Sequence, residues 1–265
     1  MKTLLLGLIF ILSFVCVYAE NNKPFKSQVF HWEKTTVTNT RNGENRQFMK
    51  GFTNSLDYID IHATTLNPGK QAPQTDIQPK FEKLIIVKEG QISQTINGEK
   101  KTLNPGSVVL AGADDILKIE NAGDKPVVYF MIQWKNSEQK QTKDLNGEDK
   151  VKIIEWENVP FVPTEKGGTR RFFKRPTDCL FEFEMHVTTL REGVKSHDPH
   201  IHPDDEIILV KSGMAEELVN GKPYQLGPGS FVLLNGNDPH GIRNIGKGAC
   251  EYFAFRFLRD RPTVR

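Results

Sequence analysis

Cysteine is scarce in this chain, and no hydrophobic run is long enough for a typical transmembrane helix. The 265 residues include three cysteines, and 35 basic side chains nearly balance 33 acidic ones, leaving a net charge of +2. So few cysteines do not make a disulfide framework, and an interspersed, nearly neutral charge gives no nucleic-acid-binding footprint. The composition excludes both classes and fits a pair of globular domains.

The longest apolar run lies near the first residue, from Leu4 to Val17, behind the basic start Met1-Lys2. It is too short for a typical transmembrane helix, and it leads to Ala19, a small residue suited to signal-peptidase cleavage. We therefore predict that residues 1–19 are a secretory signal peptide. Because Cys16 lacks a convincing lipobox, we expect a secreted or periplasmic protein without a lipid anchor, or one exported to an endomembrane lumen.

Cleavage would leave two cysteines, Cys179 and Cys250. Export to an oxidising compartment would allow them to pair. The sequence leaves open whether they form a disulfide.

The chain repeats itself with a period of about 124 residues. Trp32-Glu33 recurs as Trp156-Glu157, and the segment from His62 to Gly69 recurs from His186 to Gly193. After a slip of one residue, Asn97-Gly98 matches Asn220-Gly221. Matches in the same order over both halves indicate two copies of one domain.

Both copies have the pattern of short strands separated by turns. Gln91–Ile96 and Lys101–Leu103 flank the dipeptide Asn97-Gly98, which is a strong hairpin signal because a type I′ turn needs two positive φ angles. No helical period of useful length appears beyond the signal peptide. We predict an all-β protein with an N-terminal domain at 20–134, a polar linker at 135–150 and a C-terminal domain at 151–265.

Candidate metal ligands gather in the second copy. His200 and His202 stand two residues apart, so on an extended strand they would project to the same face. Glu206 adds a carboxylate, and His240 adds a third imidazole from a strand about one hairpin later. Three nitrogens and one oxygen can hold a divalent first-row ion and leave positions for water or substrate. The lack of a thiolate favours manganese or iron, although zinc or nickel would also suit this set.

These residues resemble a known family. His200, His202, Glu206 and Gly213 are similar to the first signature of the cupins, and residues 229–244 resemble the second, with His240 at its metal-ligating histidine. The resemblance implies two tandem jelly-roll barrels, with the metal in the mouth of the second. The architecture is similar to bicupins of the (S)-ureidoglycine aminohydrolase type, although those carry a carboxylate first, a histidine last and a glutamine in place of His240.

The first copy lacks this ligand set. Leu117 stands opposite His240, and two alignments place different residues opposite the other three ligands: Asp76, Gln78 and Glu82, or Ile77, Pro79 and Lys83. We therefore predict one divalent ion per chain, in the C-terminal barrel. The metal-free N-terminal barrel is expected to have a structural role, covering the other sheet or forming the face of a homodimer.

The last strand offers candidate catalytic residues. Phe253, Phe255 and Phe257 share one face, whereas Tyr252 and Arg256 share the other. If the phenylalanine face packs against another sheet, Tyr252 and Arg256 point into the lumen, where Arg256 would clamp a substrate carboxylate. The alternative is that Arg256 faces solvent.

His197, close to the histidine pair, is either a base beside the metal or an unliganded surface residue. Together these features predict an exported metal-dependent enzyme for a small polar carboxylate- or sugar-derived substrate. The expected reaction is isomerisation, ring opening or hydrolytic loss of a substituent. The alternatives are a metal-dependent dioxygenase and a non-catalytic ligand-binding or storage bicupin. Neither nucleic acid nor a membrane is an expected partner.

Overall fold

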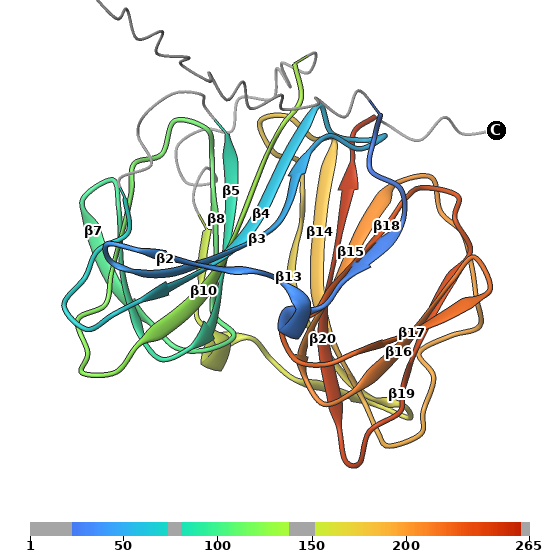
Figure 1. Cartoon of the computed structure of the whole chain (residues 1–265). Coiled ribbons are helices and arrows are strands. Elements are labelled where there is room, and N and C mark those ends of the chain that lie inside the picture. Colours follow the sequence, from blue (N-terminus) through green and yellow to red (C-terminus); the bar gives the residue numbers. More distant parts are fainter. Residues whose placement is uncertain (1–22, 74–80, 138–151, 261–265) are drawn as a thin grey trace, which may run out of the picture.

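Two β-lobes lie side by side in the computed structural model, which describes residues 23–73, 81–137 and 152–260 (Figure 1). The predicted signal peptide and most of the predicted linker lie outside these residues. The first copy comprises β1 (Gln28–Phe30), η1 (Trp32–Lys34), β2 (Val37–Thr40), β3 (Gly43–Gly51), β4 (Tyr58–Leu66), β5 (Glu82–Glu89), β6 (Ile92–Ile96), β7 (Glu99–Leu103), β8 (Val108–Ala111), β9 (Leu117–Glu120) and β10 (Val127–Lys135). The second copy comprises β11 (Lys152–Ile154), η3 (Trp156–Asn158), β12 (Val162–Thr164), β13 (Gly167–Arg175), β14 (Glu182–Leu190), β15 (Asp205–Ser212), β16 (Ala215–Val219), β17 (Lys222–Leu226), β18 (Phe231–Leu234), β19 (His240–Asn244) and β20 (Cys250–Leu258).

Each lobe is built from a seven-stranded antiparallel sheet facing a three-stranded one. The N-terminal lobe has the orders β11-β8-β5-β10-β4-β3-β2 and β7-β6-β9, and the C-terminal lobe has β1-β18-β15-β20-β14-β13-β12 and β17-β16-β19. The predicted all-β fold of two tandem barrels is confirmed. No helix among the described residues is both long enough and apolar enough to span a membrane.

The two copies exchange their first strands. β1 belongs to the first copy but pairs with β18 of the second, and β11 of the second copy pairs with β8 of the first. The 3₁₀ turn after each exchanged strand places a tryptophan against a glycine of the other lobe, Trp156 against Gly106 and Trp32 against Gly229. The contacts are so close that a Cβ atom added to either glycine would lie within 2.6 Å or 2.8 Å of the ring, respectively. The recurring Trp-Glu dipeptides therefore mark the positions where the lobes are joined.

The predicted hairpins form as the dipeptides indicated. Asn97 and Gly98 have φ angles of 48° and 92°, and Asn220 and Gly221 have 50° and 77°. These left-handed conformations are those that a type I′ turn requires. Each turn joins two strands of a three-stranded sheet, β6 to β7 and β16 to β17.

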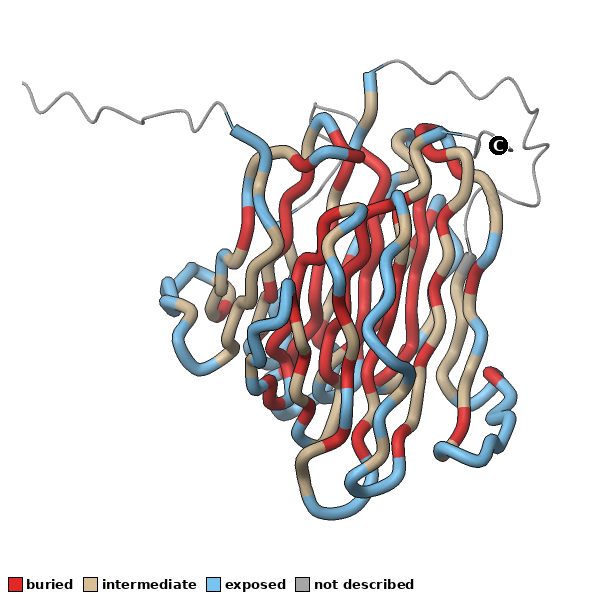
Figure 2. Tube along the Cα trace, turned by 90° about the vertical axis from the view of Figure 1, so that its right-hand side faces the viewer, coloured by how far each residue is buried: buried red, intermediate tan, exposed pale blue. Residues whose placement is uncertain are grey.

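Hydrophobic side chains form three cores. Figure 2 shows the buried residues gathered along the central strands, with exposed residues at the loops. One lies between the two large sheets and draws on both copies, and it contains Phe253, Phe255 and Phe257 of β20. The other two line the lumens of the separate lobes, and Tyr252 belongs to the lumen of the C-terminal lobe. The predicted division of β20 into a phenylalanine face and a lumen face is correct.

Two buried carboxylates connect the lobes in equivalent ways. Glu82 of β5 accepts hydrogen bonds from the Thr177 hydroxyl at 2.8 Å and the Asp178 backbone N–H at 2.7 Å. Asp205 of β15 accepts from the backbone N–H of Ser55 at 3.0 Å. Each acceptor therefore holds a turn of the opposite copy.

The two cysteines of the described chain are free thiols. Cys179 lies buried beside Glu82 at the junction of the lobes, whereas Cys250 begins β20 in the core of the C-terminal lobe. They do not form a disulfide in this structure.

Candidate metal centre

The backbone of the C-terminal lobe brings His200 and His240 together across a distance in sequence. His240 begins β19, and His200 forms an isolated antiparallel bridge with it. The His200 N–H donates to the His240 carbonyl at 3.0 Å, and the reverse hydrogen bond measures 3.1 Å. Their imidazole rings consequently lie with centroids 4.6 Å apart.

The sequence predicted one extended strand that carries both His200 and His202. That prediction was wrong: His202 lies in an irregular segment, because the regular strand pairing of β15 begins at Asp205. Pro199 and Pro203 flank the pair, and proline has no N–H to continue a strand ladder. The imidazoles converge nevertheless, with the His202 ring centroid 5.4 Å from that of His200 and 4.8 Å from that of His240.

Glu206 completes the cluster from β15. Its Oε2 lies 2.9 Å from Nε2 of His202 and 3.2 Å from Nε2 of His240. The three histidines each offer a ring nitrogen within 4.8 Å of the others. His200 is exposed, His202 is half-buried, and Glu206 and His240 are buried, so the cluster extends from the surface into the lumen. The four residues predicted as metal ligands thus lie together.

Backbone carbonyls orient two of the three imidazoles. His202 Nδ1 lies 2.9 Å from the Asp204 carbonyl oxygen, and His240 Nδ1 lies 2.8 Å from that of Asp238. A carbonyl can only accept, so both Nδ1 atoms carry the proton and both Nε2 atoms present a lone pair in the neutral rings. These lone pairs face the Glu206 carboxylate, which is also an acceptor. A proton or a metal cation between them satisfies all three groups.

The electrostatics of the cluster favour a bound cation. Burial alone would raise the pKa of Glu206, but the hydrogen bonds and positive charge that His202 and His240 supply when protonated outweigh it and lower the pKa to about 2. Burial lowers the pKa of His202, yet the hydrogen bond and charge of Glu206 leave it above its ordinary value. Burial and the neighbouring histidines, His197 first, lower the pKa of His200. The site therefore combines an ionised carboxylate with imidazoles, a donor set that fits a divalent first-row metal.

Arg256 lies at the edge of this cluster with an acidic partner. Its Nη2 donates to Oδ1 of Asp204 at 2.8 Å, its Nε donates to Oδ2, and its Nη1 lies 3.7 Å from Glu184. The side chain points to the lumen side of β20, as predicted, but its parallel N–H groups already hold a carboxylate of the protein. Sequence reasoning missed Asp204, although it stands in the acidic run between His202 and Glu206.

Tyr252 lies deeper in the lumen and is buried. It is hydrogen-bonded with Ser196 and Thr188, and burial raises its pKa above the ordinary value of tyrosine. The phenol is therefore a proton donor throughout the physiological range. Its proximity to the cluster agrees with the predicted face of β20, while its catalytic role stays a prediction.

His197, the third candidate catalytic residue, is exposed beside His200, with ring centroids 4.2 Å apart in an edge-on arrangement. Its Nδ1 lies 3.0 Å from the Asp198 carbonyl oxygen. The ring therefore borders the cluster on the solvent side. Its role as a base stays a prediction.

Glu217 of β16 is a lumen residue that sequence reasoning missed. It is 1% exposed, and neither carboxylate oxygen has a hydrogen bond of good geometry to another described residue, although the Gly241 backbone N–H partly offsets the rise in its pKa. Burial, followed by the charge of Glu206, raises its pKa well above the ordinary value. The sequence repeat could have pointed to Glu217. The strand pairing places Gln94 at the equivalent position of the first copy, so both copies have a polar side chain there.

The first lobe has no equivalent cluster among its described residues. Lys83 occupies the position of Glu206, since Lys83 pairs with Gln133 as Glu206 pairs with Arg256. Leu117 occupies the position of His240. This pairing selects the alignment that contains Lys83, whereas residues 76–79 lie outside the described residues.

A known protein family matches the chain twice, once in each copy of the repeat. The family model of the cupin domain matches residues 63–133 and again residues 186–256. The chain is 32% identical to an L-ectoine synthase of Vibrio campbellii over 99 residues, which make up 37% of this chain and 66% of that protein. It therefore covers slightly less than two thirds of that relative's length.

Two solved structures share the whole architecture. Protein Ylba from E. coli superposes with a TM-score of 0.69 at 10% identity, covering 92% of this chain and 98% of that one. The oxalate decarboxylase of Lactobacillus farciminis, in a formate complex, superposes with a TM-score of 0.69 at 11% identity, covering 91% and 89%. At such identities the likeness concerns the fold. With two matches to the domain model over more than half of its length, the chain belongs to the cupin family and is a bicupin.

Proposed function

We propose that the C-terminal lobe binds one divalent metal ion, with manganese or iron favoured, through His200, His202, Glu206 and His240. The observation that carries the proposal is the convergence of acceptors: the Nε2 lone pairs of His202 and His240 face the Oε2 of Glu206. A cation in that position removes the repulsion and uses every donor atom of the cluster. Such an ion acts as a Lewis acid on a carbonyl or carboxylate oxygen, or lowers the pKa of a bound water.

We further propose that the protein is an enzyme for a small polar substrate, bearing a carboxylate or derived from a sugar. The lumen beside the cluster contains Tyr252 and Glu217, both buried and both with pKa values raised by burial. A raised pKa favours the protonated form of each group, which makes both candidates for exchanging protons with a bound molecule. This supports proton-transfer chemistry, in the form of isomerisation, ring opening or hydrolytic loss of a substituent. The partial similarity to an enzyme, L-ectoine synthase, supports a catalytic rather than a storage role.

Arg256 is assigned a positioning part in this proposal. It fixes Asp204, whose backbone carbonyl holds the Nδ1 proton of His202. His197 borders the exposed side of the cluster, where a substrate would enter. The protein's own residues therefore orient the ligand set, while Tyr252 and Glu217 handle protons.

Metal analysis tests the first step. The purified protein should contain about one divalent ion per chain, and His202→Ala or His240→Ala should lose it while keeping the β-sheet circular dichroism spectrum. His62→Ala removes a half-buried histidine from the other lobe and is the matched control, expected to keep its metal. Full metal content in both cluster variants would refute the assignment.

A substrate screen tests the second step. The metal-loaded protein would be incubated with pools of small carboxylates and sugar derivatives, and products would be followed by mass spectrometry with oxygen uptake recorded in parallel. Conversion without oxygen consumption supports the proposed proton-transfer chemistry, whereas stoichiometric uptake would identify a dioxygenase. Export and dimerisation are separate proposals, to be checked by N-terminal sequencing of the secreted protein and by light scattering.

A further inference from the structure

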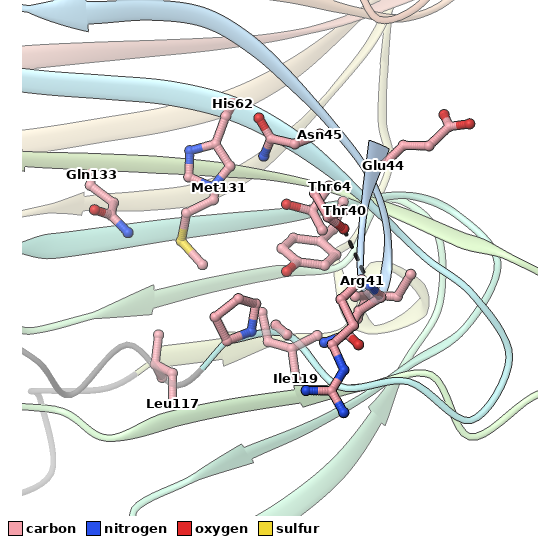
Figure 3. Close-up of a pocket in the computed structure, with 15 residues that line it drawn as sticks. Thr40, Arg41, Glu44, Asn45, His62, Thr64, Leu117, Ile119, Met131 and Gln133 are labelled. Atoms are coloured by element: carbon pink, nitrogen blue, oxygen red, sulfur yellow. Dashed lines mark hydrogen bonds between the residues drawn. The ribbon is translucent and has the colours of Figure 1, made fainter. Parts of the chain in front are cut away.

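The lumen of the N-terminal lobe contains a cavity of about 280 Å³, at the place where the other lobe carries its histidines (Figure 3). Its walls come from β4, β9 and β10, from the β2–β3 hairpin and from the segment after β4. Leu117 of β9 lines it, at the position that His240 occupies in the second copy. This space approaches the size of pockets that hold small organic molecules. The predicted structural role of this lobe leaves the cavity unexplained.

The inner surface of the cavity is mainly apolar. Figure 3 shows Leu117 and Ile119 on one side and Met131 on the other. Leu66 and Tyr129 extend this lining. An apolar wall of this kind favours a ligand with a hydrocarbon or aromatic body, because burial removes its surface from water.

Neutral polar side chains interrupt the apolar wall. Asn45 and Gln133 line the cavity with half-buried side chains, and neither side-chain amide has a hydrogen bond to another residue in the part of the chain that the structure describes. His62 also lines it and has its Nδ1 3.1 Å from Oδ1 of Asp60, so its Nε2 is the nitrogen left for another partner. Amide side chains both donate and accept hydrogen bonds. They suit a ligand group that does the same.

Charge argues against an ionised ligand. The charged side chains of the lining are Arg41, in the turn between β2 and β3, and Glu44, at the start of β3. In Figure 3 Arg41 lies at the opposite end from Gln133, and Glu44 points away from the other side chains. Asp60 behind His62 is a buried carboxylate that would repel an anion. The nearest buried cation is Lys83, the cross-strand partner of Gln133, and its ammonium already donates to the Phe81 carbonyl at 2.9 Å and interacts with the charges of Asp115 and Asp114. An anionic group placed beside Gln133 would therefore lose hydration and meet a cation that is already engaged.

We propose that the N-terminal lobe is a second binding site, for a compact neutral molecule with an apolar body and one polar end that both donates and accepts hydrogen bonds, such as a primary amide. The apolar wall with Leu117 and Met131 contacts the body. Gln133, Asn45 and His62 contact the polar end. The site needs no metal and is independent of the function proposed for the other lobe.

Benzamide and benzoate provide a matched pair of probes, since they share a shape and differ in charge. Methionine is sparse, with five residues in the chain, so methyl-labelled methionine reports on location by NMR. We expect benzamide to shift the Met131 methyl signal with a dissociation constant of about 0.1–10 mM, and benzoate to bind at least about tenfold more weakly. The methyl groups of Met185 and Met214, in the second copy, should not move. A response at those residues without one at Met131, no binding by benzamide, or tighter binding by benzoate would overturn the proposal.

Two matched variants test the location. Ala72→Trp would fill the cavity from its margin and should abolish the benzamide response. Ser196→Trp is its control, because the Ser196 N–H donates to Ile242 as the Ala72 N–H donates to Ile119, each at 2.9 Å. It should bind benzamide as the unaltered protein does. Unchanged methyl signals of Met49 and Met185, in the core between the lobes, show correct folding.

Should Ala72→Trp not fold, Gln133→Leu is the alternative variant. It keeps the side-chain volume, removes the amide and should weaken benzamide binding at least about threefold. Full affinity in a folded variant would refute the site.

Discussion

Lys83 in the N-terminal lobe occupies the strand position that Glu206 occupies in the C-terminal lobe. Lys83 is 3% exposed, and its ammonium donates to the Phe81 carbonyl at 2.9 Å. Burial lowers its pKa, and the charges of Asp115 and Asp114 partly offset that shift. A cation fixed at this position excludes a metal site like that of the second lobe. The repeat therefore preserved the barrel while exchanging the chemistry of its lumen.

Glu82, a candidate ligand in one of the two alignments, is expected to act in stability instead. Replacing it by alanine should lower the free energy of unfolding by about 2–4 kcal/mol, because the Trp134 indole N–H and the Thr177 hydroxyl lose their buried acceptor. Metal content should stay at one ion per chain. Urea unfolding and elemental analysis would measure both. Glu89→Ala, an exposed position on the same strand, is the control and should change stability by less than about 0.5 kcal/mol. A variant of Glu82 that lost metal at unchanged stability would reverse the assignment.

Metal affinity should fall as the pH falls. Imidazole must be neutral to bind a metal, and the pKa of His202 lies above its ordinary value of about 6.5. His202 should therefore protonate first, so the apparent affinity declines from near neutral pH downward, while Glu206 stays ionised because its pKa is about 2. Competition with a chromogenic chelator between pH 5 and pH 8 would record this. A flat profile would argue against imidazole ligands.

The sequence predicted the fold and the members of the site better than their local geometry. The period of the repeat predicts two copies of one domain. The Asn-Gly dipeptides predict two hairpins, because their preference for positive φ angles is local and does not depend on the rest of the fold. The exchange of β1 and β11 could not be predicted, because the repeat gives the order of equivalent strands and not the sheet edge with which each one pairs. The partner of Arg256 was also missed. Period-2 alternation gives the face of a side chain, but which carboxylate reaches it depends on the irregular segment around Pro203.

Arg256→Ala should destabilise the protein by about 1–3 kcal/mol, because Asp204 is buried and would lose its bidentate partner. Metal affinity should fall as well, since Asp204 holds His202. Arg256→Lys should recover part of both, as an ammonium cannot form two parallel bonds. The control is Arg243→Ala, which breaks an exposed pair with Glu216 and should cost less than about 1 kcal/mol. Urea unfolding and chelator competition decide the matter. A change confined to KM, at unchanged stability, would instead identify Arg256 as the substrate-carboxylate clamp.

Glu217→Gln should make the metal-free protein more stable at neutral pH. The pKa of Glu217 is raised in the folded state, by burial first and by Glu206 second, so the folded protein binds its proton more tightly than the unfolded chain does. For such a carboxyl the stability is highest below the unfolded pKa of about 4.3, and it decreases as the pH rises from there to the folded pKa. Glutamine has the same shape and cannot ionise, and Gln94 already occupies the equivalent place in the first lobe.

The advantage of Glu217→Gln should therefore be near zero at about pH 4 and grow as the pH rises. It would be measured by urea unfolding in a chelating buffer at acidic and neutral pH. Glu216→Gln, one residue away and paired with Arg243 on the surface, is the control and should show little pH-dependent gain. If Glu217→Gln were less stable than the unaltered protein at neutral pH, the ionised carboxylate would have a partner in the lumen. Glu217 would then contribute a charge to the site rather than a proton.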